Sequence, residues 1–119
     1  MKQTKFLNKF VRHWYIYKKL VFLIIKGVIH RDLKPENILL IFDNKDINRV
    51  RFTKLIDFGF AIYYNASELH EKEKLGDCEE EDIFGTPNYV APEILQSKSA
   101  TFESDVFSLG AILYAMYDF

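Results

Sequence analysis

The sequence has little of the chemistry that stabilises small secreted domains. Its 119 residues include a single cysteine, Cys78, so no disulfide can form within the chain. A lone cysteine is typical of a reducing compartment, and we therefore expect a cytoplasmic protein. Proline and glycine are also scarce, at three and five residues. Because no stretch is enriched in them and no repeat is visible, the sequence indicates neither a low-complexity linker nor a repeat array.

Long apolar runs and an excess of charge of one sign are missing as well. The apolar stretch 20–25 is six residues long and lies between lysines, whereas a membrane span needs about 20 apolar residues. No small-residue cleavage site follows it, which argues against a secretory signal. The formal net charge is −1, which gives no reason to expect nucleic acid as the main partner. We expect neither membrane binding nor nucleic-acid binding.

What the sequence does contain is enough apolar surface for one modest core. Hydrophobic residues make up 49% of the chain and aromatic residues 16%, which argues against disorder throughout. Before Gly27, apolar residues recur every three or four positions, the spacing of a helix that ends at that glycine. We predict that this helix is buried. The recurring residues are Phe6, Phe10, Trp14, Tyr17, Val21 and Ile24.

The middle of the chain predicts a β-hairpin and then a loop. Residues 38–42 are apolar and have the length of a short buried strand. Residues 43–46 are polar and turn-like, and residues 50–56 read as the returning strand. Residues 60–84 hold many charges and few apolar positions after Tyr64, so they predict a long loop.

A last helix is predicted near the end of the sequence. Ser104 is placed to cap it, because a serine hydroxyl accepts a hydrogen bond from a free amide of the first turn. Four apolar residues then share one helical face: Val106, Leu109, Leu113 and Met116. With the first helix and the hairpin, this predicts an α+β fold.

One stretch carries most of the chemical information. His30-Arg31-Asp32-Leu33-Lys34-Pro35-Glu36-Asn37 places a carboxylate, a lysine and an amide within a few positions of each other. Phosphoryl transfer needs a carboxylate to orient a hydroxyl nucleophile, a cation for charge developing on the phosphate, and an oxygen ligand for Mg²⁺. The alternative, a turn with incidental charges, becomes weaker with each further motif that follows in order.

Three further motifs follow. Asp57-Phe58-Gly59 comes directly after the predicted returning strand, where a carboxylate can approach a metal ion bound to phosphates. Residues 85–93 read Gly-Thr-Pro-Asn-Tyr-Val-Ala-Pro-Glu, and residues 104–110 read Ser-Asp-Val-Phe-Ser-Leu-Gly. Together with residues 30–37, these stretches resemble, in order, the catalytic loop, the magnesium-binding motif, the end of the activation segment and the start of the central helix of protein kinases.

The resemblance implies a Ser/Thr protein kinase. Lys34, in the pattern Leu-Lys-Pro-Glu-Asn, is typical of that type, whereas tyrosine kinases carry alanine and arginine in the corresponding stretch. Phe60-Ala61 after the Gly59 motif is similar to calcium/calmodulin-dependent or polo-like relatives. The implied fold is an incomplete C-lobe, the larger kinase lobe, made of a helix, catalytic loop, hairpin, long activation segment and central helix. ATP, Mg²⁺ and a protein substrate are implied with it, and a regulatory protein is a further class of partner.

The resemblance also assigns the catalytic and ligand-binding roles. Asp32 would accept the proton of the substrate hydroxyl, and Lys34 would offset charge on the transferring phosphoryl group. Asn37 and Asp57 would bind magnesium. Leu39 would pack beneath the adenine ring.

The resemblance assigns structural rather than catalytic roles to a second group of residues. His30 and Phe58 would be packing residues rather than catalysts. Asp105 would accept hydrogen bonds from the backbone of the catalytic loop, because a buried charge needs donors. Glu93 ends the activation segment and normally pairs with a later arginine.

The activation segment supplies the last group. Thr86 would hydrogen-bond Asp32 and Lys34, and Tyr89 fits the same Ser/Thr pattern. Arg31 would clamp an anion with its fork of donors. Asp82 lies three residues before Gly85, and it would either supply that anion permanently or belong to a solvated acidic loop.

The parts that hold most of the nucleotide are not found in this sequence. The first glycine is Gly27, so no glycine-rich loop precedes the catalytic loop. Residues 1–119 are therefore expected to be a partial kinase domain without the smaller N-lobe and the distal C-lobe helices. Three interpretations stay open: a fragment of an active Ser/Thr kinase, a catalytically inactive C-lobe fragment that acts as a binding or competing module, and a chain that does not fold stably alone.

Overall fold

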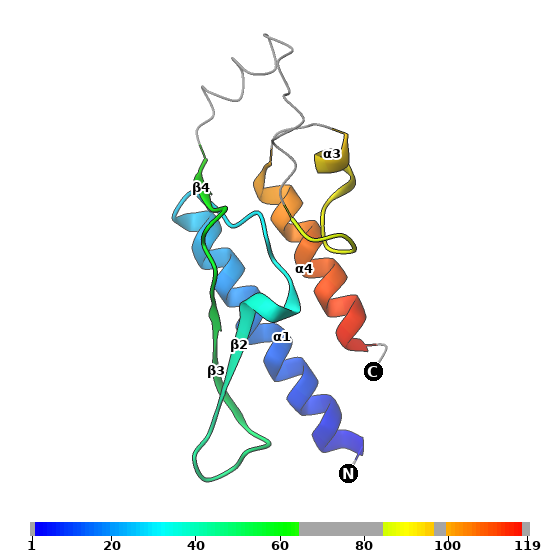
Figure 1. Cartoon of the computed structure of the whole chain (residues 1–119). Helices are drawn as coiled ribbons and strands as arrows, with labels where there is room; N and C mark the ends of the chain where they lie inside the picture. The colour runs from blue at the N-terminus through cyan, green and yellow to red at the C-terminus, as the bar shows by residue number, and fades with distance from the viewer. Residues whose placement is uncertain (1, 65–84, 97–99, 118–119) are drawn as a thin grey trace.

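The fold is built from two packed helices and a β-hairpin. The computed structural model describes residues 2–64, 85–96 and 100–117. Figure 1 shows α1 and α4 side by side, with the β2–β3 hairpin running along α1. This arrangement confirms the predicted α+β class. The elements in order are α1 (Lys2–Ile25), β1 (Val28–Ile29), the 3-10 helix η1 (Pro35–Asn37), β2 (Ile38–Phe42), β3 (Val50–Leu55), β4 (Ile62–Tyr63), α3 (Pro92–Leu95) and α4 (Phe102–Tyr117).

Helix α1 ends where the sequence predicts. Gly27 has a φ of +69°, a left-handed conformation that glycine adopts without steric cost. Its amide donates to the carbonyl of Ile24 at 3.0 Å, so one free carbonyl of the last turn is satisfied. Across the described ranges, no helix combines the length and apolarity required to cross a membrane.

The buried face of α1 differs from the predicted stripe. Ile16, Leu20 and Leu23 are buried. By contrast, Phe10 and Trp14, two members of the predicted stripe, are 60% and 49% exposed. Apolar residues occur on more than one side of α1, so their spacing identified the helix but not the side that packs against the fold.

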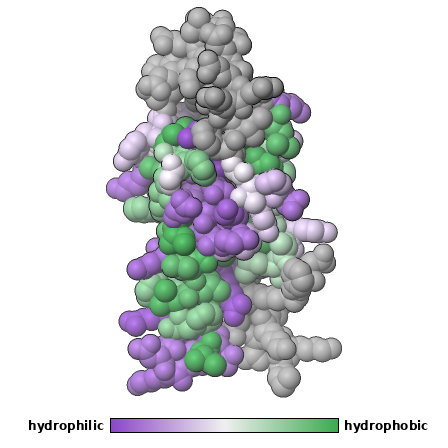
Figure 2. All heavy atoms as spheres, viewed as in Figure 1, coloured by the Kyte–Doolittle hydropathy of each residue, from purple (hydrophilic) through white to green (hydrophobic). Residues whose placement is uncertain are grey.

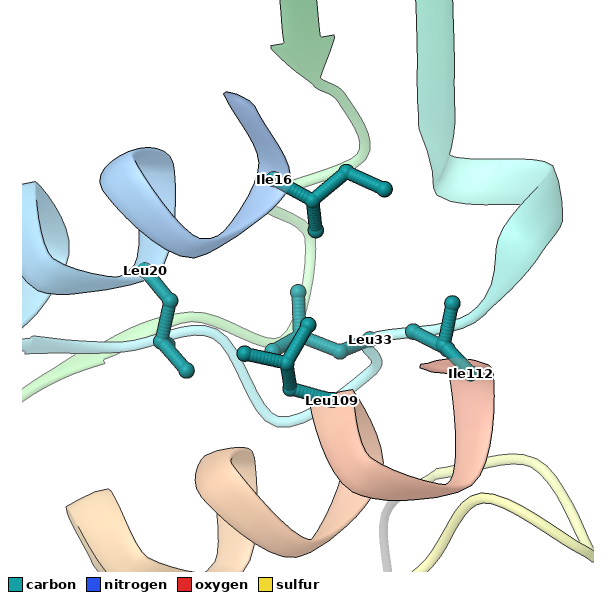
Figure 3. Close-up of a cluster of buried hydrophobic side chains, with 5 residues drawn as sticks. All are labelled: Ile16, Leu20, Leu33, Leu109 and Ile112. Carbon is teal, nitrogen blue, oxygen red and sulfur yellow. The ribbon is translucent and has the colours of Figure 1, made fainter. Parts of the chain in front are cut away.

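The core lies between the two helices. Figure 3 shows Ile16 and Leu20 from α1 gathered with Leu109 and Ile112 from α4, and with Leu33 from the segment between β1 and η1. Leu33 is 4% exposed. Because Leu33 lies between Asp32 and Lys34 in the chain, its burial fixes the backbone that carries both polar side chains.

The hairpin has the predicted strands. Strand β2 pairs antiparallel with β3, with Ile38 opposite Leu55, and an irregularity lies between Ile41 and Phe42. The Asp43 side chain accepts a hydrogen bond from the Lys45 amide at 2.8 Å, as expected of an aspartate that begins a turn. The connection covers residues 43–49 and is longer than the predicted turn at 43–46, because a second turn follows in which the Arg49 amide donates to the Asp46 carbonyl at 2.9 Å.

A short strand lies where only loop was predicted. Strand β4 pairs antiparallel with β1, with Val28 opposite Tyr63 and Ile29 opposite Ile62. The prediction of loop for 60–84 is therefore wrong at residues 62–63, and residues 65–84 lie outside the described residues. Two paired residues per strand are too few for the alternating pattern that identifies a strand in a sequence.

Helix α4 begins earlier than predicted. It starts at Phe102, and the Ser104 hydroxyl accepts the Thr101 amide at 3.1 Å and donates to the Thr101 carbonyl at 2.6 Å. Ser104 therefore reaches back from the first turn, like the third helical residue of a capping box, and is not the cap itself. Val106, predicted on the buried face, is 51% exposed, whereas Ile112 is 1% exposed.

The buried face of α4 includes polar residues, and this explains the error at Val106. Asp105 and Ser108 are buried beside Leu109 and Ile112. A hydrophobic pattern cannot detect buried polar positions, so the face was placed too far toward Val106.

A buried carboxylate joins α4 to the segment after β1. Asp105 is 1% exposed, and its two oxygens accept the amides of His30 at 2.7 Å and Arg31 at 3.0 Å. Burial raises the pKa of the Asp105 carboxyl, and the amide donors of His30 and Arg31 act in the opposite direction. The carboxylate thus depends on these two donors to remain charged inside the protein.

The same contact holds a strained backbone. Arg31 has a φ of +68°, which for a non-glycine residue costs on the order of 1–3 kcal/mol. Hydrogen bonds to a charged group contribute roughly 1.5–3 kcal/mol each. The two bonds to Asp105 are therefore strong enough to offset the strain.

We expect Asp105→Asn to lower the free energy of unfolding by about 1–3 kcal/mol. The new NH₂ group is a donor, so it cannot accept the hydrogen bond of the backbone amide that it faces. Denaturant unfolding measures this change. The matched control is Glu103→Gln, the same carboxyl-to-amide change at an exposed position of the same helix, which should cost less than about 1 kcal/mol. Equal losses in the two variants would contradict the proposed anchor.

Candidate active site

The candidate site is centred on the carboxylate of Asp32. Asp32 is 6% exposed, and its Oδ1 accepts the Thr86 hydroxyl at 3.0 Å. Its Oδ2 lies 3.5 Å from Lys34 Nζ and 3.3 Å from the amide nitrogen of Asn37. Both oxygens therefore have partners, and the carboxylate is held in one orientation.

Thr86 connects the carboxylate to the lysine. Lys34 Nζ donates to Thr86 Oγ1 at 3.0 Å, and the same hydroxyl donates to Asp32. The hydrogen bonds that the kinase resemblance implied for Thr86 are thus present. They join residues 52 positions apart in the chain, so the 85–93 segment is tied directly to the loop that carries Asp32.

The His30 ring helps to position the backbone of Asp32. The ring Nε2 lies 3.0 Å from the Ile56 carbonyl, and the ring Nδ1 lies 3.2 Å from the Asp32 amide. A carbonyl can only accept and an amide can only donate, so this pattern fits the neutral ring with its hydrogen on Nε2. The ring also packs edge-on against Phe58 at a centroid distance of 4.8 Å. The sequence suggested packing for His30, but not these two polar contacts.

Asn37 presents an oxygen toward the same region. Its amide nitrogen donates to the Asp32 carbonyl at 2.8 Å and approaches Asp32 Oδ2 at 3.3 Å. Both contacts use the nitrogen, which leaves the amide oxygen as the group that can bind a cation. The Asn37 carbonyl accepts the Ile56 amide at 2.9 Å, which extends the hairpin pairing by one step and brings Asp57 alongside.

Asp57 offers a second oxygen ligand. Its side chain is exposed and its φ is +59°, a left-handed conformation that aspartate tolerates better than most residues. The Gly59 amide donates to Asp57 Oδ1 at 3.3 Å. A Cβ at Gly59 would lie 3.2 Å from that oxygen, so a glycine there leaves room for the carboxylate.

Oxygen ligands of this kind fit magnesium. An amide oxygen and a carboxylate are hard donors, and Mg²⁺ in phosphate-transfer sites is usually held by one or two protein groups together with substrate phosphates. In the part of the chain that is described, no three His, Cys, Asp or Glu residues cluster to hold a metal without other ligands. Asn37 and Asp57 therefore suit a metal that arrives with phosphates.

The segment that carries Thr86 is fixed to α4. The amides of Tyr89 and Val90 lie 3.1 and 3.2 Å from the Thr86 carbonyl. The Ser108 hydroxyl donates to the Tyr89 carbonyl at 2.6 Å, and Tyr89 packs against the core. Ser108 was missed in the sequence, because nothing in its type or spacing distinguishes it from an exposed helical serine.

Gly85 allows close packing at the start of this segment. Its φ is +124°, a conformation that residues with side chains rarely adopt. A Cβ at Gly85 would lie 3.3 Å from the Val90 side chain and 3.4 Å from the Arg31 carbonyl. The glycine of the motif therefore has a structural reason, since it lets the segment approach Arg31.

The remaining predicted residues lie further from Asp32. Leu39 is 43% exposed on β2, and Glu93 lies in the first turn of α3. Among the described residues, no hydrogen bond joins either of them to the Asp32 group. Arg31 donates through Nε to the Phe60 carbonyl. Asp82, its predicted anion, lies outside the described residues, so that pairing stays a prediction.

The site faces solvent on one side of the molecule. Figure 2 shows a polar area over η1 and the segment leading into it, above the apolar side chains of the β2–β3 hairpin. A hollow of about 440 Å³ is lined in part by the two sequence neighbours of Thr86. The lining residues are Gly85, Pro87, Asn88, Val90, Pro92, Leu95 and Phe107. The segment that carries Thr86 thus also lines an open, largely apolar surface.

The sequence of this chain is similar to those of known proteins. Residues 5–118 match the family model of the protein kinase domain. The chain is 42% identical over 90 residues to calcium-dependent protein kinase 17 of Arabidopsis thaliana, which covers 76% of this chain and 14% of that protein. It is 41% identical over 91 residues to 3-phosphoinositide-dependent protein kinase B of Dictyostelium discoideum, covering 76% of this chain and 9% of that protein.

A third relative agrees with these two. Calcium-dependent protein kinase 7 of Oryza sativa subsp. japonica is 39% identical over 90 residues, covering 76% of this chain and 14% of the relative. The chain therefore spans only 9–14% of the length of these curated relatives. The family match includes every motif that the sequence singled out, from residue 30 to residue 110. The chain belongs to the protein kinase family, and its resemblance to eukaryotic Ser/Thr kinases is confirmed.

Proposed function

We propose that this chain supplies the catalytic loop and metal ligands of a Ser/Thr protein kinase, which transfers the γ-phosphoryl group of ATP to a Ser or Thr hydroxyl of a protein. One observation carries the proposal: Thr86 hydrogen-bonds both Asp32 and Lys34 at 3.0 Å. The Asp32 carboxylate and the Lys34 ammonium group are thereby both hydrogen-bonded to the Thr86 hydroxyl. They lie next to the segment along which a protein substrate would bind.

Asp32 acts as the base. Its Oδ1 and Oδ2 are held by Thr86 and Asn37, so the carboxylate is oriented before substrate arrives. The substrate hydroxyl donates its hydrogen to this carboxylate, its oxygen bonds to the γ-phosphorus, and the bond from that phosphorus to the bridging oxygen of ADP breaks. The hydroxyl proton passes to Asp32, and the released electron pair stays on ADP.

Lys34 stabilises the charge that develops in this step. Its Nζ lies 3.5 Å from Asp32 Oδ2 and donates to Thr86, so the ammonium is held beside the base. A positioned cation near the transferring group acts without reorganisation at the moment of reaction. Lys34 is only partly buried, at 25% exposure of its side chain, so a phosphate can reach it from solvent.

Magnesium would be held by Asn37 and Asp57. When bound, it neutralises phosphate charge. The chain's own contribution is to hold the two oxygen ligands through adjacent backbone, because Asn37 and Ile56 are hydrogen-bonded at 2.9 Å and Asp57 follows Ile56. Leu39 would contact the adenine ring from its exposed position on β2.

The substrate would lie along the 85–95 segment. The hollow of about 440 Å³ begins at Gly85 and Pro87 and is bounded by Leu95 and Phe107, so it suits an apolar side chain of a protein substrate.

We also propose a cytoplasmic location, which the single cysteine supports. The second interpretation, an inactive C-lobe module that competes with a full kinase, makes a different prediction for residues 1–119 and is tested below.

We expect Asp32→Asn, in a longer protein that contains these residues and phosphorylates a test peptide, to lower the turnover rate by about 10²–10⁴-fold, because the amide cannot accept the hydroxyl proton. ATP affinity should change little. Steady-state phosphate transfer and ATP titration measure the two quantities. Asp46→Asn, the same change in the hairpin turn, should leave both unchanged. Near-normal transfer by Asp32→Asn would rule out the base role.

Asp57→Asn should instead weaken nucleotide binding that depends on Mg²⁺, because a neutral amide oxygen is a poorer ligand for a hard cation. The measurement is ATP affinity as a function of Mg²⁺ concentration, which is independent of turnover. Asp46→Asn is again the control. An unaltered magnesium dependence would show that Asp57 is not a ligand.

Residues 1–119 on their own should bind ATP too weakly for calorimetry at micromolar protein and should transfer little phosphate. The sequence contains no glycine-rich loop to surround the phosphates. Adding a separately produced kinase N-lobe should restore some activity if the chain is a fragment of an active enzyme. Micromolar ATP affinity of the 119-residue chain would contradict this expectation, and a folded chain that no N-lobe activates would favour the binding module.

A further inference from the structure

A single β-turn begins at Thr86 and ends at Tyr89. The Tyr89 amide donates to the Thr86 carbonyl at 3.1 Å, which closes residues 86–89 into the turn. Pro87 stands at its second position, and Asn88, with a φ of +78°, stands at its third. Proline at the second position and a left-handed third residue are the features of a type II turn. Because Asn88 is not a glycine, this backbone conformation depends on support from the structure around it.

Two side-chain hydroxyls connect the turn to other elements. At its first residue, the Thr86 hydroxyl donates to Asp32 and accepts from Lys34, both at 3.0 Å. At its last residue, the Tyr89 carbonyl accepts a hydrogen bond from the Ser108 hydroxyl at 2.6 Å. Among the described residues, these are the hydrogen bonds that join the turn to the rest of the protein. The two ends of the turn are therefore fixed separately.

Helix α4 supports both the turn and the loop that carries Asp32. Ser108 holds the turn, and Asp105, three residues earlier on the same buried face of α4, holds the start of that loop. The loop and the turn are thus attached to neighbouring positions of one helix. The distance between the Asp32 carboxylate and the Thr86 hydroxyl consequently depends on two contacts of α4.

The Ser108 hydroxyl has a second acceptor within reach. Its oxygen lies 3.1 Å from the Ser104 carbonyl, one turn earlier in α4, and 2.6 Å from the Tyr89 carbonyl. A hydroxyl carries one hydrogen, and the shorter distance assigns it to Tyr89. If the turn moves away, the hydroxyl can rotate toward the Ser104 carbonyl, so that no buried donor is left unpaired. The contact between Ser108 and the turn can therefore open and close.

We propose that Ser108 is a positioning residue for the phosphoryl transfer, an inference that rests on the function proposed above. Its hydroxyl holds the Tyr89 carbonyl against α4, and the closed turn thereby fixes Thr86, whose hydroxyl orients the Asp32 carboxylate. Without the Ser108 hydrogen bond, the turn is released for part of the time, and Asp32 is then not oriented for the substrate hydroxyl. Ser108 touches none of the reacting groups and acts through Thr86.

The residues suited to magnesium provide a contrast. Asn37 and Asp57 are brought together by the hydrogen bond between the Ile56 amide and the Asn37 carbonyl. In the part of the chain that is described, no hydrogen bond connects Ser108 to either of them. Loss of the Ser108 hydroxyl should therefore slow phosphoryl transfer and leave the binding of ATP with Mg²⁺ unchanged, whereas a general loosening of the fold would weaken both.

The test compares Ser108→Ala with Ser104→Ala in the longer protein that phosphorylates a test peptide. Both changes remove a hydroxyl from a buried position of α4, but the Ser104 hydroxyl bonds to Thr101, outside the turn. Ser108→Ala should lower the single-turnover rate of transfer by about three- to tenfold, the range for loss of one hydrogen bond, with ATP affinity unchanged. Ser104→Ala should change neither quantity. Equal slowing by the two variants, or a loss of ATP affinity in Ser108→Ala, would overturn the proposal.

A double mutant shows whether Ser108 acts through Thr86. Thr86→Val keeps the shape of the side chain and removes its hydroxyl, so it should slow transfer by itself. Adding Ser108→Ala to Thr86→Val should cause little further loss, because the contact that Ser108 supports is already gone. Losses that multiply in full would contradict a role through Thr86.

Amide hydrogen exchange in the same protein tests the contact without relying on transfer. In Ser108→Ala, the amides of Tyr89 and Val90, which donate to the Thr86 carbonyl, should exchange faster. The His30 amide, which Asp105 holds, should exchange at its former rate. Unchanged exchange at Tyr89, or equally faster exchange at His30, would overturn the proposal. Near-normal transfer by Asp32→Asn would instead overturn the proposed function, and the positioning role with it, even where exchange at Tyr89 responds as expected.

Discussion

The buried carboxylate of Asp105 is the contact on which the arrangement of this protein depends. It accepts hydrogen bonds from the amides of His30 and Arg31, which lie 75 and 74 positions earlier in the chain, and so fixes the start of the segment that carries Asp32 to α4. A charge with 1% exposure is tolerated only where donors surround it. The left-handed Arg31 backbone exists because these hydrogen bonds hold it, and the direction in which the chain continues to Asp32 follows from that turn.

From this anchor, three separate segments converge on Asp32. Leu33 inserts into the core between α1 and α4, which fixes the loop from one side. Thr86 holds the carboxylate from the second segment, and Ser108 holds that segment to α4 through the Tyr89 carbonyl. His30 links the loop to the end of β3 through Ile56. The geometry of the candidate site therefore comes from these supporting contacts more than from the polar side chains themselves.

The sequence predicted the elements well where their signals were long and local. The α1 boundary at Gly27 and the β2–β3 hairpin follow from short-range patterns. The candidate-site residues were predicted from motifs that resemble those of protein kinases. The sequence did not predict correctly which side of each helix is buried. The predicted stripe containing Phe10 and Trp14 is exposed, and Val106 is exposed while Ile112 is buried. Strand β4 was missed because two residues carry no periodicity. Burial depends on what lies opposite, and a single sequence does not contain that information.

The sequence alone determined the family and singled out Asp32, Lys34, Asn37 and Asp57 as candidate site residues, because they stand in motifs that resemble those of protein kinases. Only the tertiary structure decided how they are held. Thr86 reaches Asp32 across 54 positions, and Ser108 gave no sign of its role before folding. Hydrogen bonds are short and directional, so whether two distant residues form one is settled by packing of the whole chain, and no local pattern can specify it.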